Sequence, residues 1–218
     1  MGSSTVSEPN QADIQGLVAL LNSGQVDKAV STAKRLIGKF PQAPMLHVLL
    51  GVGLAGQGKL DPAVHSYRKA LALKPDYVDA LNNLGVALRK QGKLTEAADA
   101  YSGALELQPG NPDVRQNLAT VFEETGVGLF SQGHFKDAVE LYRKVLNLRP
   151  ANAHALTNLG VGLLHLGGVE EALSNFHQAI QLEPERIESH AYHAIASKSL
   201  ARPYAEILYR ILEIPSVQ

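Results

Sequence analysis

The chain contains no cysteine and no tryptophan, and only 6% of its 218 residues are aromatic. Without cysteine it can form no disulfide, no thiol nucleophile and no thiolate metal site. Its formal net charge of -1 provides no basic excess for phosphate backbones, so nucleic acid is not an expected partner. Apolar residues nevertheless make up 45% of the chain, which is enough for an aliphatic core.

Long hydrophobic runs are missing as well. No apolar run approaches the roughly 20 residues that a transmembrane helix needs. The N-terminal segment from Met1 to Ser7 has neither the basic region nor the apolar core of a secretory signal. We therefore expect no membrane insertion and a cytoplasmic protein whose residues 1–9 form a flexible polar leader.

A four-residue phrase of glycine, valine, a small residue and leucine occurs four times in the chain. The copies begin at Gly51, Gly85, Gly126 and Gly160, which are 34, 41 and 34 residues apart. A period in this range predicts a stack of small similar units rather than a single folded active site.

Other residues follow each phrase at the same spacing. In one period they are Leu84-Gly85, Leu88, Gly92, Ala97, Tyr101, Ala104 and Pro109. In these residues the chain resembles the tetratricopeptide repeat family. The resemblance implies an all-α, right-handed α-solenoid of stacked helical hairpins. It places five repeats at residues 10–43, 44–77, 78–111, 112–152 and 153–186, followed by a degenerate helix pair at 187–213 that acts as a cap.

The hydrophobic pattern independently supports helical hairpins. In the unit from 78 to 111, apolar residues recur in steps of three and four on both sides of Gly92. Such steps predict amphipathic helices, and the short turn at Gly92 makes the second helix an antiparallel neighbour of the first. Proline then ends the second helix of four units, at Pro75, Pro109, Pro150 and Pro184.

The fourth unit carries seven extra residues between Gly85 and Gly126. Seven residues are about two helical turns, so an insertion of this length keeps the apolar face of a helix in phase. We expect one long helix from about 112 to 132. The alternative is a break at Gly126 and Gly128, and a dedicated role of this helix in partner contact stays open.

No sequence motif predicts an active site. The segment from Gly51 to Gly56 has the pattern G-x-G-x-x-G of dinucleotide-binding loops. However, no strand is predicted before it, and its Gly-Val-Gly-Leu sequence recurs in other units inside predicted helices. His190 and His193 stand at helical spacing without a third ligand. We therefore expect no catalytic, cofactor-binding or metal-binding residues, and no enzymatic activity.

The resemblance implies that the first helix of each unit lines the inner wall of the stack, the surface on which such solenoids bind ligands. One inward position is β-branched and apolar in every unit; its occupants are Val18, Val52, Val86, Val127, Val161 and Ile195. One interpretation is an apolar stripe that receives a hydrophobic segment of a partner. The other is a position half-buried between neighbouring helices.

Asparagines and one threonine lie beside these valines. They are Asn82, Asn83, Asn117, Thr157 and Asn158. An asparagine amide both donates and accepts, so a line of asparagines can pair with the main chain of an extended peptide. The arrangement is similar to the asparagine ladder of the nucleocytoplasmic O-linked N-acetylglucosamine transferases, although other residue types interrupt it in the remaining units.

The same wall also carries charges of opposite sign on consecutive units, because the basic Arg89 lies at the end of one first helix and the acidic Glu123 lies in the next. The lysines and arginines of the clamp that grips chaperone C-termini are absent at the matching positions. The predicted partner-binding groove comprises Val52, Asn82, Asn83, Val86, Arg89, Asn117, Glu123, Val127, His154, Thr157, Asn158 and Val161.

Together these features predict a scaffold that binds a partner protein or peptide, of identity unknown, in its concave groove. One alternative is the substrate-recruiting arm of a larger glycosyltransferase or sulfotransferase. Another is a self-assembling scaffold that forms a homo-oligomer through its C-terminal helix, where Ile207, Leu208, Ile211 and Leu212 form an apolar face.

Overall fold

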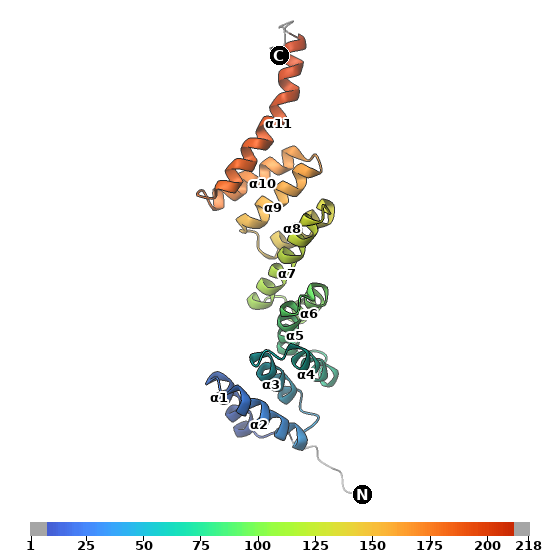
Figure 1. Ribbon diagram of the computed structural model, residues 1–218, viewed down its shortest axis with the longest axis vertical. Helices are drawn as coiled ribbons and strands as arrows, with labels where there is room; N and C mark the ends of the chain where they lie inside the picture. The colour runs from blue at the N-terminus through green and yellow to red at the C-terminus, as the bar shows by residue number, and fades with distance from the viewer. Residues whose placement is uncertain (1–7, 212–218) are drawn as a thin grey trace. The chain divides into compact units, whose positions relative to one another are not determined.

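The computed structural model describes residues 8–211, with side chains from residue 8 to residue 199. Over residues 8–211 the chain forms eleven helices and no strand, which confirms the predicted all-α solenoid of helical hairpins (Figure 1). The first helices of the hairpins are α1 (Gln11–Asn22), α3 (Pro44–Gly56), α5 (Val78–Lys90), α7 (Pro112–Ser131) and α9 (Ala153–His165). The second helices are α2 (Val26–Lys39), α4 (Leu60–Leu73), α6 (Leu94–Leu107), α8 (Phe135–Leu148) and α10 (Val169–Leu182). A last helix, α11 (Ile187–Ile211), follows them.

Each hairpin reverses at a glycine with a positive φ angle, a conformation that other residues rarely adopt. These glycines are Gly24, Gly58, Gly92, Gly133 and Gly167, with φ between 70° and 83°. At Gly92 the glycine amide donates to the Arg89 carbonyl at 2.9 Å, and the Lys93 amide donates to the Leu88 carbonyl at 3.0 Å. The turn thereby satisfies the last carbonyls of the first helix, and the second helix can start directly.

The repeated glycine of each four-residue phrase lies against an aromatic ring of the second helix. A Cβ atom placed on Gly51 would approach the Tyr67 ring to 2.5 Å, and one on Gly85 would approach the Tyr101 ring to 2.7 Å. The aromatic side chains at this position, Tyr67, Tyr101, Tyr142 and Phe176, are all buried. The first helix therefore contacts the second through its glycine, and its opposite face is left for other contacts.

Three further glycines in these phrases, Gly53, Gly128 and Gly162, would be explained if they allow close helix packing as well, since glycine inside a helix costs about 1 kcal/mol relative to alanine. Two of them do, because a Cβ atom on Gly53 would lie 2.8 Å from Val30 and one on Gly162 would lie 2.6 Å from Val139. Gly128 does not, because nothing lies within 4 Å of a Cβ atom placed on it. Packing therefore does not explain this glycine.

The chain divides into two compact units, Met1–Val121 and Phe122–Gln218, and the division falls inside α7. This helix is continuous over 20 residues, where the sequence predicted a helix from about 112 to 132, and neither Gly126 nor Gly128 interrupts it. In the first unit, side chains link consecutive hairpins. Gln57 donates to Asp27 at 2.6 Å, Gln91 donates to Asp61 at 2.8 Å, and Arg68 pairs with Glu96 at 2.7 Å.

In the second unit, Arg143 pairs with Glu171 at 2.8 Å, and α11 packs against α9 and α10. The predicted helix pair over 187–213 is replaced by this single helix, Ile187–Ile211. The physical reason is that the segment contains no glycine, whereas every hairpin turn uses one with positive φ. The apolar face predicted around Ile207, Leu208, Ile211 and Leu212 lies outside the residues whose side chains are described, as does the leader up to residue 7.

Candidate binding surface

Three of the predicted groove residues, Val52, Asn83 and Val86, line one hollow in the first unit. Its volume is 230 Å³. The hollow, referred to below as the unit 1 hollow, is lined by Val52, Ala55 and Gly56 of α3, Tyr67 of α4, and Asn83, Val86, Ala87 and Lys90 of α5. The first helices of two consecutive hairpins therefore form its walls.

The two valines of the unit 1 hollow are half-buried, so their side chains are neither in the core nor fully in solvent. On α3 the small residues Ala55 and Gly56 follow Val52, and this leaves space beside the valine. The Tyr67 ring is buried, and this burial raises the pKa of its hydroxyl well above the ordinary value, so the ring stays neutral. The hollow thus combines aliphatic walls with an uncharged aromatic residue.

The asparagines of the first unit differ in what they can offer a ligand. The Asn117 amide donates to the Asn82 carbonyl oxygen at 3.0 Å, so these two residues pair with each other. The side chain of Asn83 is half-buried and has no hydrogen-bond partner among the described residues. Asn83 therefore presents a free donor and a free acceptor to the hollow.

Two basic residues follow Val86 on α5. Arg89 is half-buried on this helix. Lys90 is exposed, lines the hollow, and has no ion pair or hydrogen bond within the described part of the chain. Lys90 was not among the predicted groove residues, although it lies one helical turn after Val86.

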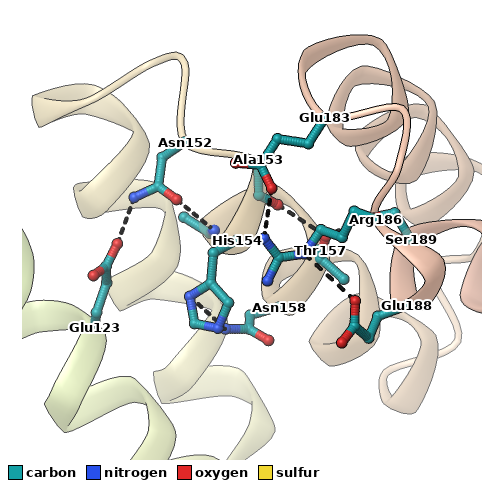
Figure 2. Close-up of polar contacts among 11 residues, drawn as sticks. Glu123, Asn152, Ala153, His154, Thr157, Asn158, Glu183, Arg186, Glu188 and Ser189 are labelled. Carbon is teal, nitrogen blue, oxygen red and sulfur yellow. Dashed lines mark hydrogen bonds and ion pairs between the residues drawn. The ribbon is translucent and has the colours of Figure 1, made fainter.

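In the second unit, Val127, Asn158 and Val161 stand 75 residues after Val52, Asn83 and Val86 respectively. The side chain of Val127 is 51% exposed, and those of Asn158 and Val161 are half-buried. The amide nitrogen of Asn158 lies 3.2 Å from Nε2 of His154, an exposed residue one turn earlier on α9 (Figure 2). Unlike Asn83, this asparagine already has a partner on its own helix.

Glu123 belongs to a polar cluster in the second unit. Its carboxylate accepts a hydrogen bond from the Asn152 amide (Figure 2). The same carboxylate lies 3.6 Å from the Arg149 guanidinium. Burial and, secondarily, the negative charge of Glu123 raise the pKa of Tyr142 to about 12. The predicted place of Glu123 in the groove thus competes with contacts inside the chain.

Thr157 is placed between helices rather than on an open surface. Its side chain is buried, and its hydroxyl oxygen lies 2.8 Å from that of Ser189 on α11 and donates to the Ala153 carbonyl at 2.8 Å (Figure 2). Ser189 is also fully buried. We therefore leave Thr157 out of the binding surface, since its hydroxyl joins α9 to α11.

The β-branched position is partly exposed in all six helices that carry it. Val18, Val127 and Ile195 are exposed, and Val52, Val86 and Val161 are half-buried. The exposed residues fit an apolar stripe that is open to a partner, and the half-buried residues fit a position between neighbouring helices. The stripe residues that combine with a measurable hollow are those of α3 and α5.

Comparison with known families settles which repeat this is. Models of the tetratricopeptide repeat match residues 14–43, 48–112 and 129–167. The chain belongs to the tetratricopeptide repeat family. No curated protein sequence matches it.

Solved tetratricopeptide repeat structures share its fold. YrrB, described as a TPR protein with an unusual peptide-binding site, is 20% identical and superposes with a TM-score of 0.62 over 84% of this chain and 91% of its own. MamA is 22% identical, with a TM-score of 0.58 over 82% of this chain and 98% of its own. At these identities the likeness establishes the tetratricopeptide repeat fold.

Residues 8–199 contain no group of three or more histidines, aspartates and glutamates that could hold a metal ion. Among the helices up to residue 211, none combines the length and the hydrophobicity needed to cross a bilayer.

Proposed function

We propose that the chain is a non-enzymatic protein-interaction scaffold that binds an extended segment of a partner protein on the first helices of its hairpins. The unit 1 hollow is the main contact in this proposal. Val127, Asn158 and Val161 of the second unit form a second set of the same composition. The fold that the chain shares with YrrB, itself a peptide-binding repeat protein, supports this class of function.

The unpaired amide of Asn83 carries the proposal. It stands in the same hollow as Val52 and Val86, and it has no partner among the described residues. An extended peptide has main-chain donors and acceptors at every residue and presents alternate side chains to one side. It can therefore pair with the Asn83 amide while it places an aliphatic side chain between the two valines.

The free energies expected for these contacts correspond to a moderate, reversible interaction. A hydrogen bond of this kind contributes about 1 kcal/mol, and complete burial of a leucine or valine side chain contributes about 2 kcal/mol. One such site gives weak affinity by itself. A partner that contacts both units would gain from both, since linked sites reinforce each other.

The proposal is tested by selecting peptides from a random library against the full chain and against the variant Val52→Glu/Val86→Glu. We expect peptides that bind the wild type and lose binding to the variant, while circular dichroism shows the helices intact. Leu107→Glu is the matched control, because Leu107 is an exposed aliphatic residue on a second helix. Peptides that bind the double variant as well as the wild type would contradict the proposal.

A second candidate is self-association through α11, favoured by two exposed aliphatic side chains on this helix. Ile187 is 79% exposed and Ile195 is 56% exposed. Light scattering over a range of concentrations tests this candidate. A dimer that Ile187→Ser/Ile195→Ser converts to a monomer would support it, and a wild-type monomer at every concentration would exclude it.

A further inference from the structure

We propose that the unit 1 hollow selects acidic peptides, in which a branched aliphatic residue and a side-chain carboxylate are two positions apart. This inference rests on the proposed function, because it specifies the ligand of the same hollow. The aliphatic residue lies between Val52 and Val86, and the carboxylate pairs with Lys90.

The spacing follows from the geometry of α5. Val86 and Lys90 are four residues apart on one helix, and side chains at this separation are neighbours about 6 Å apart. An extended peptide advances about 3.3 Å per residue and alternates its side chains between two faces. Residues at positions i and i+2 therefore face the same wall at about the spacing of Val86 and Lys90.

The charges around the hollow favour a carboxylate. The ammonium group of Lys90 has no partner among the described residues. The residues that line the hollow include no aspartate or glutamate. Of the carboxylates on the neighbouring hairpins, Asp61 accepts a hydrogen bond from Gln91 at 2.8 Å and Asp27 accepts one from Gln57 at 2.6 Å. An acidic side chain is thus the group that this end of the hollow lacks.

The surface continues beyond the hollow, so a bound peptide need not end there. This favours a side-chain carboxylate of the peptide over its C-terminal carboxylate as the partner of Lys90. Gly56 also lines a second, more polar hollow of 470 Å³ with Gly24, Val26, Asp27, Gln57 and Lys59. The Lys59 ammonium likewise has no partner in the described part of the chain. A peptide that passes over Gly56 can therefore extend further and meet a second cation.

The second unit has different chemistry at the matching place. His165 stands there, 75 residues after Lys90, and its ring stacks on Phe135 with centroids 4.0 Å apart and planes 6° apart. Phe130 contacts both rings from the side, at 5.0 Å and 5.7 Å. The valine and asparagine positions are shared between the units, but the free lysine belongs to the first unit, so the acidic preference is assigned to that unit alone.

The test uses peptides selected from a random 12-residue library against the full chain and kept only if Val52→Glu/Val86→Glu abolishes binding. Their affinities are then measured by fluorescence polarisation on the wild type, on Lys90→Glu and on Lys69→Glu. Lys69 is an exposed lysine of the second helix α4 and serves as the matched control. Each peptide is also made with its acidic residue replaced by lysine.

We expect the kept peptides to carry an aliphatic and an acidic residue two positions apart, in either chain direction. Lys90→Glu should weaken them about tenfold, because it replaces an attraction by a repulsion. The lysine-substituted peptides should regain affinity on Lys90→Glu, and Lys69→Glu should change nothing.

Two results would overturn the inference and leave the proposed function standing. Valine-dependent peptides without an acidic residue would be one, and affinities unchanged by Lys90→Glu would be the other. A library that yields no valine-dependent peptide would instead refute the proposed function and this inference with it. A concentration-dependent mass of the free chain that Lys90→Glu abolishes would show that a second copy occupies the hollow, which contradicts a partner peptide.

Discussion

Asn117 donates a hydrogen bond of 3.0 Å to Asn82, a residue one repeat earlier in the chain. Both side chains are half-buried and therefore lose hydrogen bonds with water when the chain folds. The hydrogen bond between the two amides replaces part of that loss. Their neighbour Asn83 has no such partner among the described residues. Adjacent asparagines of one helix thus differ, because Asn82 is paired within the fold and Asn83 is the one to which the proposed function assigns a contact with the ligand.

This difference predicts opposite effects of two alanine substitutions. Asn82→Ala should lower the free energy of unfolding by about 1 kcal/mol, because it leaves the Asn117 amide unpaired, and should barely change peptide affinity. Asn83→Ala should leave stability nearly unchanged and weaken a peptide bound in the unit 1 hollow about fivefold. Urea denaturation and fluorescence polarisation measure the two quantities. Equal effects of both substitutions on affinity would contradict the assignment.

The glycines of the first helices should respond to alanine according to their surroundings. Gly85→Ala places a Cβ atom 2.7 Å from the Tyr101 ring and should destabilise the fold by about 1–3 kcal/mol. Gly128→Ala meets nothing within 4 Å and should stabilise α7 by up to about 1 kcal/mol through helix propensity. Thermal unfolding of the two variants checks this contrast. A Gly85→Ala protein as stable as the wild type would show that the tyrosine ring can move aside.

The buried hydroxyl pair of Thr157 and Ser189 should behave as a unit. Thr157→Val leaves the Ser189 hydroxyl without this partner in a fully buried place, at a cost of about 1–3 kcal/mol. Adding Ser189→Ala to Thr157→Val removes the unpaired group and should restore part of that loss. A double-mutant cycle of unfolding free energies measures the coupling. Additive losses would mean that the two hydroxyls do not stabilise each other.

The raised pKa of Tyr142 predicts a loss of stability in base. Its ordinary pKa of 10.0 rises to about 12 in the folded protein, because of burial and then of the charge of Glu123. The unfolded chain therefore releases this proton at a lower pH than the folded chain does. The stabilisation is fully present below pH 10 and is lost as the pH rises toward 12. Tyr142→Phe should reduce the fall in melting temperature over this range, and an equal fall in both proteins would count against it.

Much of the fold was predictable because it depends on residues close together in the chain. Gly92 and its equivalents predicted the hairpin turns, since a positive φ angle is a local requirement that glycine meets. The resemblance to the family implied a helix pair over 187–213, although this segment contains no glycine for a turn. The structure shows one helix there, Ile187–Ile211.

The predicted groove residues were less uniform than the repeat pattern suggested. Val52, Asn83 and Val86 come together in one hollow, whereas Thr157 is buried against α11. Lys90 was not among the predicted groove residues, although its spacing from Val86 was evident. Its availability to a ligand depends on its having no ion pair among the described residues, and that is a property of the assembled repeats.

The sequence by itself therefore determined the repeat, its helices and the side of each helix on which a residue lies, because a helix of fixed period and a glycine turn are local consequences of residue type. Only the tertiary structure decided which polar groups remain free. Asn82 and Asn117 are 35 residues apart, and Thr157 and Ser189 are 32 apart, so each pair forms only when neighbouring repeats pack. Asn83 and Lys90 have no side-chain partner within residues 8–199, and in the proposed complex both contact the ligand.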